Sequence, residues 1–410
     1  MKNYFSLLIF SLLSFHSFSK VEHVRAMFNS NAATAFTIGW NQTSGKDPVL
    51  FYDTDSQKEV FSNKVSISTS NKAKSLNSHF VRLKNLNPST KYYFYIQDSE
   101  GKSRIFHVST VSNSADTKIS FIAGGDSRDG RETRKKGNEI VAKLRPDAVL
   151  FNGDFIGLDI PAQWKDWFDD WETTIPADGR IAPMVVTRGN HEVTNMVMND
   201  LFDVPTSNIC YSTTFGGDLL NVISLNSEIL KIGAQKMFLR QSLKEHANYH
   251  WQLPQYHRPI RAHVAAKKEM ETQYENFVPL FEQYPNVRLC LENDSHTCKT
   301  TWPIVSSKGD GSSEGFIRND EKGIVYVGEG CWGAPLRTAD DIKPWTRDAE
   351  GVNQVNWIFV SKEKIEVRTI LYENAAEVEA LSDDNRFKMP QNIKFWGPKN
   401  GELIEIFKRK

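Results

Sequence analysis

The sequence predicts an N-terminal β-sandwich followed by an α/β domain built on a parallel sheet, and two patterns support this division. Residues 20–112 contain short alternating or aromatic runs separated by polar, turn-rich stretches, which is typical of a sandwich. From residue 118 onward, apolar runs alternate with amphipathic stretches that are compatible with helices. Strands that alternate with helices predict a parallel sheet, because parallel neighbours need a crossover connection.

Length and charge limit the classes of protein to consider. The chain has 410 residues, enough for two or three domains with a substantial core. Its 50 basic and 50 acidic side chains cancel, so charge gives no reason to expect a nucleic-acid polymer or an anionic membrane as the main partner. The sequence does not indicate an oligomeric state.

Residues 1–19 have the pattern of a signal peptide. Lys2 precedes an apolar run from Tyr4 to Phe15, and small residues follow where cleavage is expected. The alternative is a membrane anchor, but the run is shorter than the roughly 20 residues that a span requires. We therefore expect an exported protein without a membrane span, located in the periplasm or the extracellular medium.

The four cysteines leave two states open. Cys210, Cys290, Cys298 and Cys331 permit three pairings in an exported chain, and none has zinc-finger spacing. Cys290 and Cys298 flank a candidate ligand segment, so one local disulfide and buried free thiols are both compatible with the sequence.

The sandwich is predicted from six strand-like runs and one turn motif. The runs are Val24–Phe28, Ala35–Trp40, Val49–Tyr52, Phe80–Leu83, Tyr92–Ile96 and Ile105–Val108. Residues 86–92 predict a tyrosine corner, in which the Tyr92 hydroxyl reaches back to nearby backbone. Trp40 is interpreted as a core residue. The polar residues 113–117 are typical of a linker.

The α/β domain is predicted over residues 118–375. Its first five elements are a strand at Ile119–Ala123, a helix at Glu132–Leu144, a strand at Asp147–Phe151, a helix at Ala162–Trp171 and a strand at Pro183–Val186. Later strands are expected at Leu219–Leu225, Trp251–Tyr256, Val287–Leu291, Gly323–Val327, Trp357–Val360 and Ile365–Tyr372, with helices at Gln235–Leu243 and Glu271–Tyr284. Residues 376–410 are expected to form a C-terminal extension with a terminal hairpin between Asn392 and Phe407.

Each of the first three strands runs into a polar cluster. Asp126, Asp154 and Asn190 follow these strands, each beside a glycine. Ligands of parallel sheets bind beyond the carboxyl ends of the strands, so these side chains should meet at one edge. Carboxylate and amide oxygens bind hard cations, and a carboxylate can bridge two of them. The pattern therefore predicts a two-metal hydrolytic site.

Three ordered segments carry a family resemblance: Gly125-Asp126, Gly153-Asp154 and Gly189-Asn190-His191-Glu192. They resemble the first three sequence blocks of the calcineurin-like metallophosphoesterases, and within that group the chain is most similar to the purple acid phosphatases and their bacterial relatives. The resemblance implies an αββα-type catalytic domain. Residues 20–112 resemble the fibronectin type III-like domain that precedes it in plant-type enzymes. We interpret that module as a packing and positioning domain, in preference to a carbohydrate- or partner-binding one.

The resemblance also implies the remaining ligands. His257 matches the histidine block after the third segment, and Asp294 and His296 stand where the family's last block is expected. The implied ligand sets are Asp126, Asp154 and His296 for one metal, and Asp154, Asn190, His257 and Asp294 for the other. Asp294 replaces a family histidine with a hard anionic donor, which favours manganese, iron or magnesium over a purely zinc site. The expected cofactor is thus two ions drawn from iron, manganese, zinc and magnesium.

Further roles are expected around the metals, of which the resemblance implies those of His191 and Gly157. His191 is expected to act as general acid or transition-state stabiliser, or alternatively to orient Asn190. Arg128 is expected to clamp a phosphate oxygen, a structural ion pair being the alternative. Arg258 and His263 are predicted to line the substrate opening. Gly157 stands where purple acid phosphatases carry the tyrosinate that colours the ferric enzyme, so this protein is predicted to be colourless.

These inferences predict an exported phosphohydrolase that acts on small phosphomonoesters through metal-activated hydroxide. Two alternatives remain open at this point. One is a phosphodiesterase acting on nucleotides or phospholipid headgroups, because loops around the same metals set selectivity. The other is a protein with a decayed site that binds phosphate or a surface polymer.

Overall fold

The computed structural model describes residues 20–229 and 232–409. The predicted signal peptide at residues 1–19 lies outside these ranges. No helix within them has the length and apolar character that a membrane span requires.

The N-terminal residues form the predicted β-sandwich. One layer contains β1 (Val21–Met27), β2 (Phe36–Gln42), β6 (Leu76–Leu83) and β5 (Thr69–Ala73); the other contains β4 (Asn63–Val65), β3 (Val49–Asp53), β7 (Lys91–Asp98), β8 (Gly101–Lys102) and β9 (Phe106–Ser109). Trp40 is completely buried. The Asn87 amide donates to the Tyr92 hydroxyl at 2.7 Å, so the predictions of a core tryptophan and a tyrosine corner are confirmed.

The first sheet of the α/β domain has the predicted parallel core. Strands β10 (Ile119–Gly124), β11 (Ala148–Phe151) and β12 (Met184–Val186) are parallel neighbours. Their crossovers contain α1 (Arg131–Leu144), α2 (Pro161–Trp171) and the short η1 (Glu172–Thr174). On the other side of β10, β22 (Gln354–Val360) and β23 (Lys364–Leu371) extend the sheet in antiparallel fashion.

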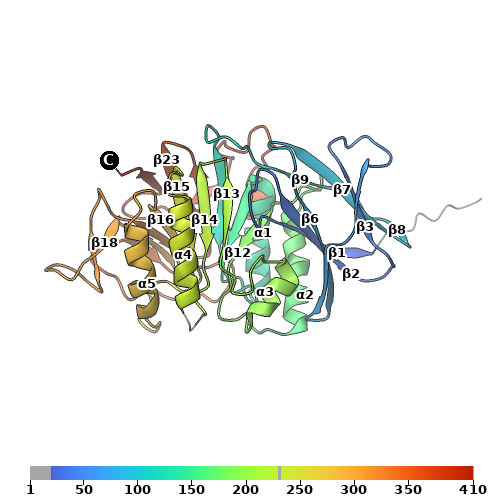
Figure 1. Cartoon of the computed structure of the whole chain (residues 1–410). Coiled ribbons are helices and arrows are strands. Elements are labelled where there is room, and N and C mark those ends of the chain that lie inside the picture. The colour runs from blue at the N-terminus through green and yellow to red at the C-terminus, as the bar shows by residue number, and fades with distance from the viewer. Residues whose placement is uncertain (1–19, 230–231, 410) are drawn as a thin grey trace, which may run out of the picture.

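A second sheet packs on the first. Its order is β13 (Tyr211–Phe215), β14 (Leu220–Ser224), β15 (Trp251–Gln255), β16 (Leu289–Glu292), β20 (Val325–Gly328), β17 (Cys298–Thr301) and β21 (Thr346–Glu350). Outside these sheets lie α3 (Asn195–Phe202), α4 (Gly233–Glu245), α5 (Glu271–Glu282), η2 (Ala375–Glu377) and the pair of β18 (Ile304–Ser306) and β19 (Phe316–Arg318). Helices α4 and α5 lie on one side of the strands, and α1 and α2 lie on the other (Figure 1). The predicted αββα arrangement is confirmed.

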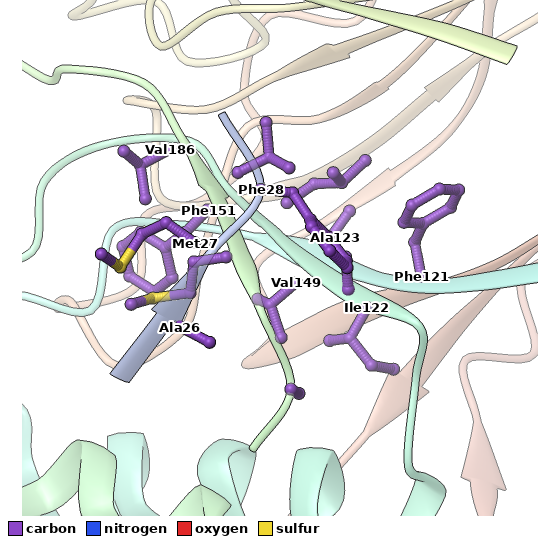
Figure 2. Packing of buried hydrophobic residues seen from close by; sticks show 14 of the residues in the cluster. Ala26, Met27, Phe28, Phe121, Ile122, Ala123, Val149, Phe151 and Val186 are labelled. Carbon is purple, nitrogen blue, oxygen red and sulfur yellow. The ribbon is translucent and has the colours of Figure 1, made fainter. Parts of the chain in front are cut away.

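The sandwich and the α/β domain share one sheet, which the sequence did not reveal. Strand β1 pairs in parallel with β12, with Met27 opposite Met184, and an 11-stranded sheet therefore runs through both units. Figure 2 shows Met27 in the same apolar cluster as Val149 and Val186. Ala115, within the expected linker, is only 7% exposed and belongs to this cluster too.

The predicted C-terminal hairpin is wrong. β24 (Lys394–Phe395) and β25 (Leu403–Phe407) both pair antiparallel with β23, at successive positions along it. They are two parts of one interrupted edge strand. Gly397-Pro398 and Gly401 lie in the intervening loop, where the Gly401 amide bonds to the Pro398 carbonyl at 3.0 Å. Glycine and proline allow a loop that interrupts one strand as readily as a hairpin turn between two strands, so the sequence does not distinguish the two.

All four cysteines are buried free thiols. Of the two states that the sequence left open, the structure has the one without a Cys290–Cys298 disulfide.

A buried arginine joins the sandwich to the helices of the α/β domain. Arg25 is 1% exposed, and its guanidinium donates to the Leu201 carbonyl at 2.8 Å and to the Ser78 hydroxyl at 3.0 Å. It also lies 4.6 Å from the centre of the Phe168 ring. Burial lowers the pKa of Arg25 to about 9. The two units are therefore expected to unfold together.

Arg25→Ala should lower the free energy of unfolding by about 2–4 kcal/mol, because packing and buried hydrogen bonds are lost together. Unfolding in guanidinium, followed by both tryptophan fluorescence and circular dichroism, should show one transition. Its midpoint should lie at a lower guanidinium concentration than that of the parent. The exposed Arg240→Ala is the control and should unfold like the parent. Two separate transitions, of which only one moves, would contradict a shared folding unit.

Candidate metal centre

The turns that carry the candidate ligands approach one another so closely that their glycines cannot be replaced. A Cβ added at Gly125 would lie 2.2 Å from Asn293 Nδ2, and one at Gly189 would lie 2.2 Å from Asp154 Oδ1. Asp126 and Asp154 themselves adopt left-handed conformations, each with φ of 54°. Such backbone is uncommon outside glycine, and it turns both carboxylates into the space between the strand ends.

The structure gathers the predicted ligands into two groups that share one carboxylate. Asp126, Asp154 and His296 form one group, and Asp154, His257 and Asp294 form the other, with the ligand atoms of each group within 4.8 Å of one another. These five residues are all buried. Asn190 joins the second group, because its Oδ1 lies 3.2 Å from His257 Nε2. Asp154 is thus common to both groups, which is the position that a bridging ligand requires.

Backbone carbonyls orient both imidazoles. His257 Nδ1 lies 2.8 Å from the Asn152 carbonyl, and His296 Nδ1 lies 2.9 Å from the Pro335 carbonyl. A carbonyl can only accept, so each Nδ1 carries a hydrogen and each Nε2 faces the carboxylates. This is the usual orientation of a metal-binding histidine.

The electrostatics of the groups fit bound cations. Burial, together with Asp154 and Asp294, raises the pKa of Asp126 to about 7, and Asp126 Oδ1 is buried without a hydrogen-bond partner. Burial lowers the pKa of His296 to about 3, with Arg337 adding to the shift, so this imidazole is neutral and can ligate. Burial alone would lower the pKa of His257, but Asp154, Asp294 and Asp126 together outweigh it and raise that pKa well above its usual value. The buried carboxylates therefore attract positive charge.

Two residues for which the sequence predicted no function also support the site. Lys267 Nζ lies 2.8 Å from Asp294 Oδ2, so an ammonium partly compensates the carboxylate that replaces the family histidine. Glu192 is completely buried and accepts from the amides of Asp154, Phe155 and Gly189 at 2.7–3.0 Å. It thereby ties the second strand end to the third. The motif contained Glu192 without indicating this function, whereas Lys267 belongs to no motif.

His191 and Arg128 lie beside the two groups. His191 Nδ1 lies 2.5 Å from the Gly157 carbonyl, and its Nε2 lies 3.7 Å from Asp154 Oδ2, with a quarter of the side chain exposed. Arg128 Nη1 lies 3.5 Å from His296 Nε2. Among residues 20–229 and 232–409, no carboxylate oxygen lies within 4.0 Å of the Arg128 guanidinium nitrogens, and Arg128 Nε is buried without a hydrogen-bond partner. The alternative of a structural ion pair for Arg128 therefore lacks a partner in this part of the chain.

The two residues predicted to line the substrate opening have different surroundings. Arg258 Nε donates to Glu228 at 2.8 Å, and both side chains line a cavity of about 440 Å³. His263 is completely buried, with its ring nitrogens 3.1 Å from Glu329 Oε1 and 2.7 Å from the Thr346 hydroxyl. The prediction that His263 lines the opening is wrong, because the side chain points into a buried polar network.

Comparison with known protein families agrees with this geometry. Residues 21–110 match the model of the purple acid phosphatase N-terminal domain, and residues 103–297 match that of the calcineurin-like phosphoesterases. The chain therefore contains a calcineurin-like phosphoesterase domain, preceded by a domain of the purple acid phosphatase N-terminal type. A domain of this family implies a dinuclear metal centre, and the donor set described above fits one. No curated protein sequence matches the chain significantly.

Two solved structures have a similar fold. Purple acid phosphatase PPD1 from yellow lupin (Lupinus luteus) seeds superposes with a TM-score of 0.71 at 15% identity, over 88% of this chain and 73% of that one. PhoD superposes with a TM-score of 0.66 at 12% identity, over 87% of each chain. At such identities the likeness concerns the fold alone.

Asp294→His should change which metal this phosphoesterase prefers. The substitution removes a negative charge and the partner of Lys267, and it restores a softer nitrogen donor, so zinc should compete better against manganese and iron. Mass spectrometry of the metals retained from an equimolar mixture measures this. Lys267→Met, which keeps the carboxylate, should retain the parent's order of preference. Identical selectivity in Asp294→His and the parent would contradict the assignment of Asp294 as a ligand.

The iron-loaded phosphoesterase should show no visible charge-transfer band. Gly157 contributes only its carbonyl to the site, as the acceptor for His191, and brings no phenolate. The absorption spectrum of protein reconstituted with ferric iron checks this. A band in the visible region would mean that another tyrosine reaches the metal.

Proposed function

We propose that this protein is an exported dinuclear-metal phosphohydrolase that cleaves small phosphomonoesters. The observation that carries the proposal is the position of Asp154, which is shared by two buried ligand groups and lies beside the partly exposed His191. Export rests on residues 1–19 of the sequence alone. Bound ions would neutralise phosphoryl charge and lower the pKa of a coordinated water, which makes hydroxide available near neutral pH.

The chain's own residues supply the other parts of the reaction. His191, when protonated, keeps one N–H on the Gly157 carbonyl and has Nε2–H available for the oxygen of the leaving group, which is the role of a general acid. Arg128 has its guanidinium beside the ligand His296 and can hold a phosphate oxygen through its planar fork. Both residues act on a substrate that sits at the opening of the metal groups.

One observation favours a diester substrate with an apolar part as the second candidate. Leu158 follows the glycine that binds His191, and Val193 lies two residues after that histidine. They are 60% and 65% exposed, and the nearby Met196 is 66% exposed. Exposed apolar side chains beside a site suggest an apolar ligand surface, such as that of a phospholipid headgroup ester with its chains attached.

The metal-reconstituted protein should hydrolyse p-nitrophenyl phosphate, and Asp154→Asn should lower the rate by at least about 100-fold, because the bridging carboxylate is lost. Initial rates and bound metal are measured together. The exposed Asp310→Asn is the matched control and should keep the rate and two ions per chain.

Other outcomes separate the alternatives. Faster turnover of bis-p-nitrophenyl phosphate would favour the phosphodiesterase. If neither ester is hydrolysed, or Asp154→Asn equals the parent, the hydrolase proposal fails. Fewer than two bound ions in an inactive parent would then support the phosphate- or polymer-binding alternative.

A further inference from the structure

A turn of the N-terminal sandwich reaches the segment that orients His191. Strands β5 and β6 are joined by the two residues Lys74 and Ser75, since Ala73 pairs with Leu76. Lys74 Nζ donates to the Asp159 carbonyl at 2.8 Å and lies 2.9 Å from Asp159 Oδ1. The Lys74 ammonium of the sandwich thus contacts two atoms of Asp159 in the α/β domain.

Asp159 belongs to a short segment that side chains hold in place. Trp164 Nε1 donates to Asp159 Oδ1 at 2.7 Å. Gln163 Oε1 accepts from the amides of Gly157 and Leu158 at 2.8 and 2.7 Å. The carbonyl of the same Gly157 accepts from His191 Nδ1 at 2.5 Å. Lys74 and His191 therefore hold the two ends of residues 157–159.

The conformation of the turn also sets Lys74 apart. Lys74 and Ser75 have φ of 51° and 62°, so both residues are left-handed. Two-residue hairpin turns of this kind strongly prefer Asn-Gly. A lysine here is disfavoured by its backbone, and residues kept in such conformations tend to occur where function requires them.

We propose that Lys74 is a positioning residue for His191, acting across the boundary between the sandwich and the α/β domain. The Asp159 side chain is only 6% exposed, whereas Lys74 is 25% exposed. Without the ammonium, the Asp159 carbonyl loses this donor and its carboxylate keeps only the neutral indole of Trp164. Residues 157–159 can then shift, and the imidazole follows the Gly157 carbonyl. The catalytic consequence rests on the proposed function of His191.

Lys74→Asn tests the proposal without endangering the fold, because asparagine suits a left-handed turn. The variant should keep its thermal midpoint and both metal ions, with little change in KM. Its kcat should fall about threefold to tenfold, less than the hundredfold that a misplacement of about 1 Å can cost, and the acidic and basic limbs of its pH profile should move. Lys74→Arg should restore most of the rate. The exposed Lys72→Asn on the same hairpin is the control and should match the parent.

A second measurement does not depend on turnover. The ring nitrogen signals of His191 in ¹⁵N NMR spectra should shift or broaden in Lys74→Asn and in Asp159→Asn, with no further change when both are combined. Unchanged His191 signals in a folded Lys74→Asn protein would overturn the proposal, whatever the rate. If the parent hydrolyses neither ester but the signals move as expected, the proposed function fails while the positioning role of Lys74 stands.

Discussion

The close approach of three strand-end turns is the constraint on which the rest of the site depends. A Cβ at Gly153 would lie 2.4 Å from the Gly189 amide nitrogen, so two main chains touch where side chains would normally separate them. Glu192 closes this contact by accepting amides from both turns. The carboxylates that follow the glycines then have no room to spread apart. Backbone packing, rather than attraction between the ligands, holds the site together.

This constraint has an electrostatic cost that the surroundings offset. Asp126, Asp154 and Asp294 are buried within a few ångströms of one another, and carboxylates placed this way disfavour mutual ionisation. Lys267 brings positive charge to the same place, and two bound cations would complete the balance. A buried carboxylate cluster of this kind is weak as a stabilising element and strong as a binding site. The fold provides its stability elsewhere, in the apolar cluster that spans both sheets.

Local signals were sufficient for part of the site and failed for the rest. Asp126, Asp154 and Asn190 follow strands whose order fixes a common edge, so sequence alone brought them together. His257 and His263 lie six positions apart in one irregular segment, and nothing in its pattern tells which imidazole faces the metals and which faces Glu329. The pairing of β1 with β12 joins residues far apart in the chain. The hydrophobic periodicity of a segment predicts a strand but does not show which distant strand it pairs with. Lys267 meets Asp294 only through the fold.

The interrupted strand at the C-terminus matters for the protein in solution. β24 and β25 cover one side of β23, and Arg288 Nε, just before β16 of the other sheet, donates to the Phe407 carbonyl at 3.1 Å. The last residues thereby close an edge of the large sheet and fasten it to the second one. A chain that ended before β24 would leave the amides and carbonyls of β23 free to pair with another molecule, and exposed strand edges of this kind lead to aggregation. The terminal segment thus covers an edge of β23 that could otherwise pair with another molecule.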